Sequence, residues 1–384
     1  MNNGVLLVLV AGWLAACAPT VVTEPVDIDN LLSGRVLFGT VVDVRDIRTD
    51  RVLALNDDMR DYVDAKTGND PQARSRLRKL IEGMIDDGLL TLDYDPNLTY
   101  TAIETFRNRQ GNCLSFSILF AALAREAGLD LTFQMVEIPP SFRADGNMIL
   151  LNNHINVRVK GVRRDINFAG DYVVDFNTAE YNGNYDTREV DDNYAIALYF
   201  SNSAVEAMQA GDPERAFRYL KKGIETDPEI AGLWVNLGVL YSRQEKYDMA
   251  ADAYRQALSI QSSNKSALAN LASTLRHLGR VEEARHYEKQ VTYYRDHNPY
   301  YHYYLAQSDY QDDRLDDAMA HLADAIRLKD DEHQFYFMQG LIYEKLQDYD
   351  LAASNYRKAR EIAGKADLVY GYTRKLEALE PRRR

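Results

Sequence analysis

The feature that most constrains the fold of this chain is a repeat in its C-terminal half. Five alanines recur there at intervals of 34 residues, namely Ala216, Ala250, Ala284, Ala318 and Ala352. Small residues are needed where two helices cross closely, and large residues such as Trp234 and Tyr254 fill the space beside the crossing. A period of this length predicts stacked helix pairs, each of which buries its apolar face only against its neighbours.

The residues within each period resemble the tetratricopeptide repeat, whose pattern is Trp, Leu-Gly, Tyr and then Ala at characteristic offsets. The clearest unit has Trp234, Leu237, Gly238, Tyr241, Ala250, Tyr254 and Ala257, and the last has Tyr336, Gly340, Tyr343, Ala352, Tyr356 and Ala359. The resemblance implies an all-α solenoid of five repeats over residues 197–366, followed by a capping helix and tail at 367–384.

Arrays of this family usually bind peptides or proteins along a concave surface that is lined by the first helix of each unit. The candidates for such a groove are Tyr300, Tyr303, Tyr310 and Phe337. Tyrosine offers a large amphipathic contact area at a low cost in conformational entropy. The same rings could instead pack between repeats, and the chain is rich in tyrosine throughout, with 26. The sequence leaves both interpretations open.

The N-terminus begins with an apolar run from Val5 to Ala16. It is too short to span a bilayer, which takes about 20 residues, but it suits the core of a signal peptide. Its end, Leu14-Ala-Ala-Cys17, resembles the lipobox of bacterial lipoproteins. The resemblance implies a signal peptide over residues 1–17 with lipidation of Cys17, and a protein of the outer membrane facing the periplasm. An ordinary cleaved secretory peptide is the alternative.

Between this leader and the repeats, the sequence predicts two further segments. Residues 18–34, with Pro19 and Pro25, are expected to form a linker. Residues 35–190 are expected to form a mixed domain in which strands and helices both occur. Its expected strands cover 35–42, 131–136, 154–159 and 172–176, and its expected helices cover 57–66, 70–88, 102–106 and 113–128.

Cys113 is the residue of this domain best suited to act as a nucleophile. The chain has only 2 cysteines, so lipidation of Cys17 would leave Cys113 as the single thiol in an oxidising compartment. Cys113 begins an expected helix, where partial positive charge and free N–H groups favour a thiolate. The same N–H groups can hold an oxyanion, with Asn112 or Gln110 as supporting candidates. The alternative is a small, buried and inert side chain.

A nucleophilic cysteine needs a base, and the base needs a group that orients it. His154 is the candidate base, because every other histidine lies in the repeat region. Asp175 lies near the end of the following strand, and two adjacent antiparallel strands would bring the two residues together. Asp165 and Asp171 are the alternatives for the orienting acid.

The order of these residues and their surroundings resemble the bacterial transglutaminase-like family, which shares the papain-like arrangement of Cys, His and Asp. The matching residues are Phe106, Arg109, Gly111, Asn112, Cys113, Ala121, Leu123, Gly128, Asn153, His154, Val174, Asp175 and Phe176. The resemblance implies an α+β papain/transglutaminase-like domain in which Cys113 is the nucleophile, His154 the base and Asp175 the orienting acid.

Charge and motifs narrow the functional classes further. The formal net charge of −13 opposes binding to nucleic acid. No metal-binding spacing of Cys and His and no glycine-rich phosphate loop occurs, so neither a metal nor another cofactor is expected. The leading hypothesis is a lipid-anchored periplasmic cysteine hydrolase, of the peptidase or amidase type or an acyl transferase, whose repeats recruit a protein or peptide. The alternative is a non-catalytic scaffold that assembles envelope proteins.

Overall fold

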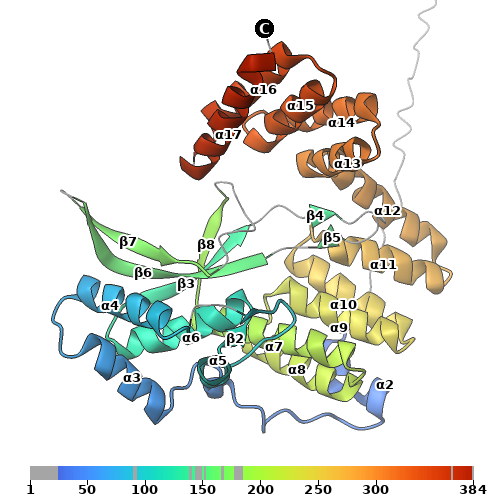
Figure 1. Cartoon of the computed structure of the whole chain (residues 1–384). Helices are drawn as coiled ribbons and strands as arrows, with labels where there is room; N and C mark the ends of the chain where they lie inside the picture. The colour runs from blue at the N-terminus through green and yellow to red at the C-terminus, as the bar shows by residue number, and fades with distance from the viewer. Residues whose placement is uncertain are drawn as a thin grey trace, which may run out of the picture.

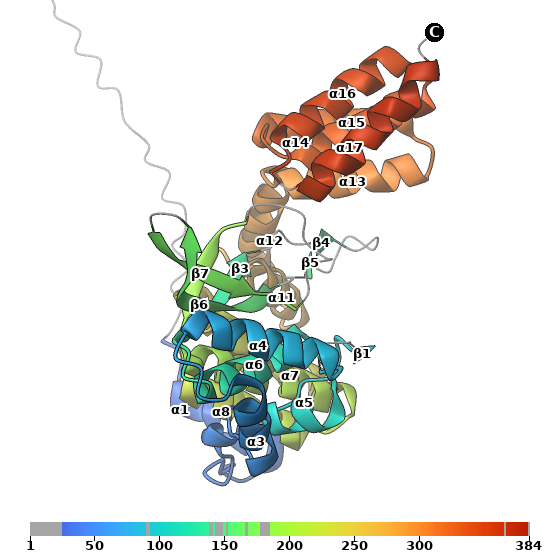
Figure 2. The same ribbon diagram turned by 60° about the vertical axis from the view of Figure 1, so that its left-hand side comes forward.

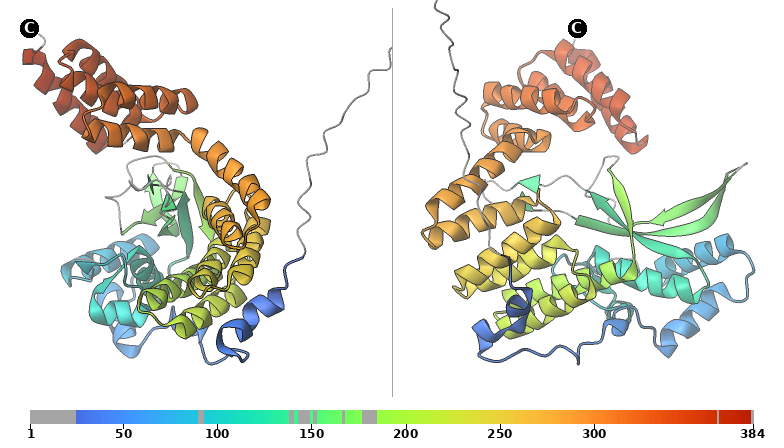
Figure 3. Two further views of the ribbon diagram at one scale, coloured as in Figure 1. Left: turned by 90° about the vertical axis from the view of Figure 1, so that its right-hand side faces the viewer. Right: turned by 180° about the vertical axis from the view of Figure 1, so that it is seen from behind.

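The computed structural model describes residues 25–89, 93–137, 141–142, 149–150, 153–165, 168–176, 185–364 and 366–382. A mixed α/β region is followed by an array of helices that curves around it (Figures 1 and 3). The expected signal peptide and Cys17 lie outside the described residues. Within the part of the chain that is described, no helix combines the length and the apolar character needed to cross a membrane.

A four-stranded antiparallel sheet forms one layer of the mixed region, with the strand order β7-β6-β3-β8. The strands are β3 (Leu131–Glu137), β6 (Asn153–Asp165), β7 (Phe168–Val174) and β8 (Thr187–Val190). Two smaller pairs join β1 (Asp93–Tyr94) to β2 (Gln110–Gly111) and β4 (Ser141–Phe142) to β5 (Ile149–Leu150). The expected mixture of helices and strands is therefore present in this half of the chain.

The helices of the mixed region are α3 (Asp57–Thr67), α4 (Ala73–Asp86), α5 (Ala102–Asn108) and α6 (Cys113–Glu126). Helix α6 packs on β3 and β6 and against α3 and α5, while α4 also packs on β6 (Figure 2). Ile118, Leu119 and Phe120 are fully buried. A helix that is apolar on all sides must be enclosed, and this enclosure holds the N-terminus of α6 in a defined place.

The array consists of consecutive helix pairs followed by a single helix at its C-terminal end. Its helices are α7 (Asp192–Gln209), α8 (Pro213–Thr226), α9 (Ala231–Arg243), α10 (Tyr247–Ile260), α11 (Lys265–His277), α12 (Val281–Asp296), α13 (Pro299–Gln311), α14 (Leu315–Leu328), α15 (His333–Lys345), α16 (Tyr349–Ile362) and α17 (Ala366–Leu379). Gly238 of α9 lies directly against the ring of Tyr254 in α10, and Gly340 of α15 lies against Tyr356 in α16. The small residues thus stand where the helices of a pair cross.

Helix α7 joins the two halves into one body. Ala195, Ile196 and Phe200 belong to the core of the mixed region, whereas Ala197 and Ala204 belong to the core of the first repeats. One helix therefore presents different faces to two cores.

The expected linker over residues 18–34 and the expected strand over 35–42 are both wrong where the structure describes them. Residues there form two short helices, α1 (Ile28–Ser33) and α2 (Arg35–Phe38). Gly34 and Gly39 end them with φ angles of 76° and 75°, a backbone conformation that glycine adopts without strain. The apolar side chains pack on the repeats instead of pairing with another strand.

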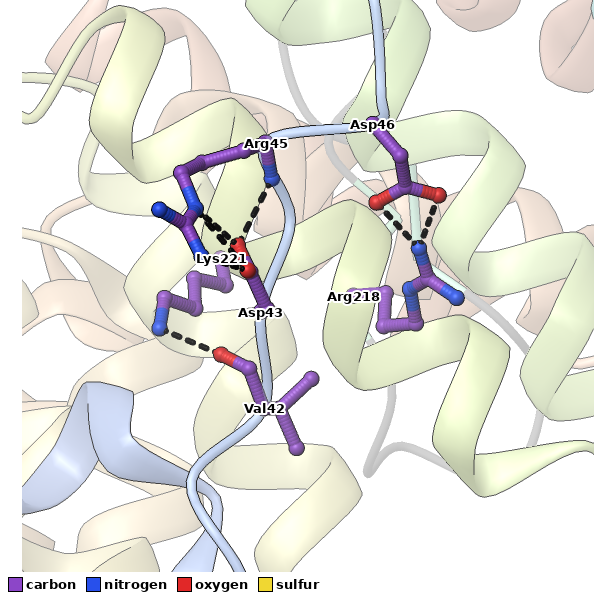
Figure 4. Close-up of polar contacts among 6 residues, drawn as sticks. All are labelled: Val42, Asp43, Arg45, Asp46, Arg218 and Lys221. Atoms are coloured by element: carbon purple, nitrogen blue, oxygen red, sulfur yellow. Dashed lines mark hydrogen bonds and ion pairs between the residues drawn. The ribbon is translucent and has the colours of Figure 1, made fainter.

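Contacts with α8 and α9 hold this N-terminal segment on the array. Leu31, Val42 and Val44 are buried in the core of the first repeats, and the hydroxyl of Tyr241 donates to the Leu31 carbonyl at 2.6 Å. Figure 4 shows two further contacts, in which Lys221 Nζ donates to the Val42 carbonyl at 2.7 Å and Arg218 pairs with Asp46. The segment from Ile28 to Val44 therefore packs with the repeats, not with the domain expected over 35–190.

Candidate active site

Cys113 is the first residue of α6, and the loop before it sets this helix start. Asn112 is the N-cap, and its side-chain oxygen accepts a hydrogen bond from the Ser115 backbone N–H at 3.0 Å. Its amide nitrogen donates to Thr99 Oγ1 at 2.8 Å. Gly111 has a φ of 149°, and a Cβ there would come within 2.6 Å of the Ser115 Cβ. Cys113 is a free, half-buried thiol at a tightly held helix N-terminus.

The expected oxyanion support by Asn112 conflicts with this arrangement. The Asn112 side chain is buried and bonded at both ends, so its amide serves the helix start. Gln110 lies in β2, where its backbone pairs with Asp93 of β1. The backbone N–H groups of the first turn of α6 are the better candidates for an oxyanion, since the start of any helix leaves such donors without partners in the helix.

His154 lies on β6, and Asp175 directly follows β7. Nε2 of His154 is 2.7 Å from Oδ1 of Asp175, and the His154 side chain is 5% exposed. The register of the two antiparallel strands pairs Val157 with Val174, which places Asp175 beside the start of β6. The structure thus brings together the two residues that strand order alone had suggested.

Asn156 completes this group, and the sequence reasoning missed it. Its amide nitrogen donates to Oδ2 of Asp175 at 3.1 Å, and the residue is 2% exposed. Successive side chains of a strand alternate between two faces, so His154 and Asn156 share one face of β6. Asn156 could therefore have been found in the sequence as the second residue after His154 on the same expected strand.

The structure also separates Asp175 from its sequence alternatives. The Asp171 carboxylate accepts hydrogen bonds from Arg158 Nε at 2.7 Å and from the Gly161 N–H at 3.0 Å. The Asp171 carboxylate is therefore bonded to residues within the β6–β7 hairpin. The side chain of Asp165 lies outside the described residues.

Electrostatics join His154 to both of its partners. Burial by itself lowers the pKa of His154, but hydrogen bonds to Asp175 and to Cys113 outweigh it and raise the pKa to about 9. Because Nε2 faces Asp175, Nδ1 is the nitrogen left for Cys113. The ring is therefore arranged to hold a proton between a thiol and a carboxylate.

Two contacts hold the cysteine helix against the segments that carry His154 and Asp175. Ser117 Oγ donates to the Ile155 carbonyl at 3.1 Å, which ties α6 to β6. The ring of Phe176 lies with its centroid 6.1 Å from that of Phe116 and 5.9 Å from that of Phe120. Because Phe176 follows Asp175, this packing also positions the carboxylate.

The four aromatic residues expected to line a groove pack between helices of the array. Tyr300 and Tyr303 of α13 lie against Phe335 of α15, with ring centroids 5.7 and 5.1 Å away. The remaining contacts are those of Tyr310 with the ammonium of Lys345 and those of Phe337 with Tyr356 and Tyr372. Of the two interpretations left open by the sequence, packing between repeats agrees with these contacts.

The mixed region also contacts the later repeats. Tyr185, which precedes β8, forms a hydrogen bond with Gln334 of α15, and burial raises the pKa of its phenol. Strand β4 lies beside α13. The first half of the chain is thus in contact with the array at both α7 and α13–α15.

Comparison with protein families identifies the repeats. Tetratricopeptide-repeat family models match residues 231–264, 266–292 and 303–367. The C-terminal half therefore contains tetratricopeptide repeats, which indicates protein or peptide binding. No transglutaminase family model matches the N-terminal α+β region.

Similarity to individual proteins is limited. An uncharacterised protein of Methanocaldococcus jannaschii is 28% identical over 72 residues, which cover 19% of this chain and 84% of that protein. MamA of Desulfovibrio magneticus RS-1 is 19% identical and covers 43% of this chain and 94% of its own, with a TM-score of 0.25. YrrB, a repeat protein with an unusual peptide-binding site, is 20% identical over 46% of this chain and 92% of its own, also at 0.25.

Proposed function

We propose that this protein is a cysteine hydrolase for peptide or amide bonds, and that its repeats recruit a protein or peptide partner. One observation carries the proposal: His154 is hydrogen-bonded both to Asp175 and to Cys113. A nucleophile, a base and a group that orients the base are the three parts required for acyl transfer by a thiol.

The reaction follows from the positions of these three side chains. The proton of the Cys113 thiol resides on His154, in keeping with the raised pKa of His154, and the sulfur attacks the substrate carbonyl carbon to form a C–S bond. His154 then gives the proton to the leaving amine as the C–N bond breaks. Water attacks the thioester and loses a proton to His154. The C–S bond then breaks, the acid is released, and the proton on His154 is again shared with the sulfur of Cys113. An amine in place of water would give acyl transfer instead of hydrolysis.

The surroundings of Cys113 support each step. The N-terminus of α6 stabilises negative charge on sulfur and offers backbone N–H groups to the oxyanion. Asp175 stabilises the imidazolium form of His154, and Asn156 holds the second carboxylate oxygen in place. His154 is almost fully buried, and electrostatic interactions are stronger where water is excluded.

The cellular setting remains part of the proposal. The sequence at Leu14–Cys17 supports a lipid anchor on Cys17 and a place at the outer membrane, facing the periplasm. A periplasmic enzyme of this kind would meet envelope proteins or peptides, which the repeats could deliver to Cys113.

The decisive experiment is the alkylation of Cys113 by iodoacetamide as a function of pH. Residues 18–384 contain this thiol alone. We expect rapid alkylation well below the pH at which an ordinary cysteine reacts, near pKa 8.5. His154→Ala should remove this low-pH reactivity. Slow alkylation that ignores the His154 change would contradict the proposal.

A scaffold without catalysis is the second candidate, favoured by the observation that the family matches lie in the repeats. The full chain with Cys113→Ser distinguishes the two functions. If the variant captures the same partners and supports the same cellular phenotype, the repeats suffice. If capture persists but the phenotype is lost, the thiol is required for function.

A further inference from the structure

A second cluster of chemically active side chains lies in the repeat array, away from Cys113. His302 of α13 and His321 and Asp324 of α14 each place a ligand atom within 4.8 Å of the others. The two imidazole rings have centroids 6.1 Å apart. We propose that these three side chains bind a divalent transition-metal ion such as Zn²⁺.

His302 has the bonding pattern of a metal ligand. Its Nε2 lies 3.0 Å from the backbone carbonyl of Asp296, so Nε2 carries the proton and Nδ1 keeps a free electron pair. Nδ1 is buried and has no hydrogen-bond partner among the described residues. Metal-binding histidines usually donate their other ring N–H to a carbonyl or carboxylate, which fixes the ring and its tautomer.

The other two ligands come from one face of α14, since residues three apart in a helix are neighbours. Nε2 of His321 lies 3.6 Å from Oδ2 of Asp309, whose carboxylate is also paired with Arg314. Asp324 Oδ1 accepts a hydrogen bond from Arg327. A carboxylate is charged at neutral pH, so Asp324 would bring a negative charge to the ion.

Two imidazoles and one carboxylate form a donor set that suits Zn²⁺ and leave a fourth tetrahedral position for water. Tetrahedral bonds of about 2.0 Å place ligand atoms about 3.3 Å apart. The ligands would therefore have to approach by about 1.5 Å at most from their present limit of 4.8 Å. Rotation of partly exposed side chains can supply this movement.

The position of the cluster suggests what the ion would do. The buried core of the first repeats ends in α12, and a separate small core begins in α13 and α14. An ion held by both α13 and α14 would link these two helices. Metal that binds only the folded form raises the stability of that form, so the ion would stabilise this second core.

The test uses the full chain without a polyhistidine tag, carrying Cys17→Ser and Cys113→Ser so that neither thiol binds metal. After removal of metal by a chelator, Zn²⁺ is titrated calorimetrically and Co²⁺ is followed by its visible absorption. We expect one ion per chain, and at least about 100-fold weaker binding in His302→Ala and in His321→Ala. His286→Ala, an exposed histidine of α12, should bind as before.

Asp324→Asn provides a second variant of nearly unchanged shape, which guards against a loss of folding in the histidine variants. It should also weaken Zn²⁺ binding and remove any metal-dependent increase in Tm. The proposal is overturned if the chain binds no Zn²⁺ at about 100 μM, or if binding persists unchanged in His302→Ala and Asp324→Asn.

Discussion

Nε2 of His154 lies 2.7 Å from Oδ1 of Asp175, although the two residues belong to different segments of a hairpin. The contact depends on the register of β6 against β7, which sets Asp175 beside the beginning of β6. Asn156 holds the other oxygen of the same carboxylate. The imidazole is therefore fixed on one side, and its remaining nitrogen is available to Cys113.

Replacing Asp175 by asparagine should lower the reactivity of Cys113. Asn keeps the size of the side chain but removes the negative charge that stabilises the His154 imidazolium. We expect the rate of iodoacetamide alkylation at pH 6.5 to fall at least about tenfold. Asp171→Asn is the matched control, since Asp171 pairs with Arg158 instead, and it should leave the rate within about twofold. Equal effects of both changes would refute the assignment of Asp175.

Asn156→Ala should affect both stability and reactivity. It removes the Asn156 hydrogen bond to Oδ2 of Asp175, and a hydrogen bond to a charged group contributes about 1.5–3 kcal/mol. The pKa of His154, measured by NMR, should also shift as the carboxylate loses its fixed position. Asn236→Ala removes a comparable amide contact, to Ser201 in the array, and should cost stability without altering the His154 pKa. A shift in both variants would argue against a specific role for Asn156.

The stability of the protein should depend on pH through His154. Its pKa in the folded state is raised from 6.5 to about 9, so the folded state binds the proton more tightly than the unfolded state does. The proton on His154 contributes at most about 3 kcal/mol to the free energy of unfolding. This contribution is complete below about pH 6.5 and is lost as the pH rises through 9. Urea unfolding at pH 6 and at pH 10, compared with His154→Gln, measures the difference. An identical pH dependence in the variant would be evidence against this linkage.

Two glycines of α9 should respond to alanine in opposite directions. Gly238 lies against the Tyr254 ring, where an added Cβ would overlap ring atoms, whereas a Cβ at Gly232 meets nothing within 4 Å. Gly238→Ala should therefore destabilise the chain by about 1–3 kcal/mol. Gly232→Ala should stabilise it by up to about 1 kcal/mol, because alanine favours a helix. Thermal unfolding measures both, and a stabilising Gly238→Ala would contradict the close crossing of α9 and α10.

The sequence by itself determined the features that depend on local patterns. The 34-residue period with Gly238 and Gly340 at the crossings predicted the helix pairs, because each repeat packs mainly on its neighbours in the chain. The apolar residues after Cys113 likewise predicted a helix. His154 and Asp175 could be selected because only one histidine lies outside the repeats and because the next strand ends in an acid.

Only the tertiary structure decided features that depend on partners distant in the chain. Short apolar segments form helix or strand according to what they pack against, and for residues 28–38 that partner is the array, with Leu31 bonded to Tyr241. Tyr300 and Phe337 suit a groove or a core equally well as isolated residues, and only the structure places their rings against Phe335 and Tyr372. The part played by Asn156 follows from strand register, which sets which side chains meet across a sheet and which cannot be read from one strand alone.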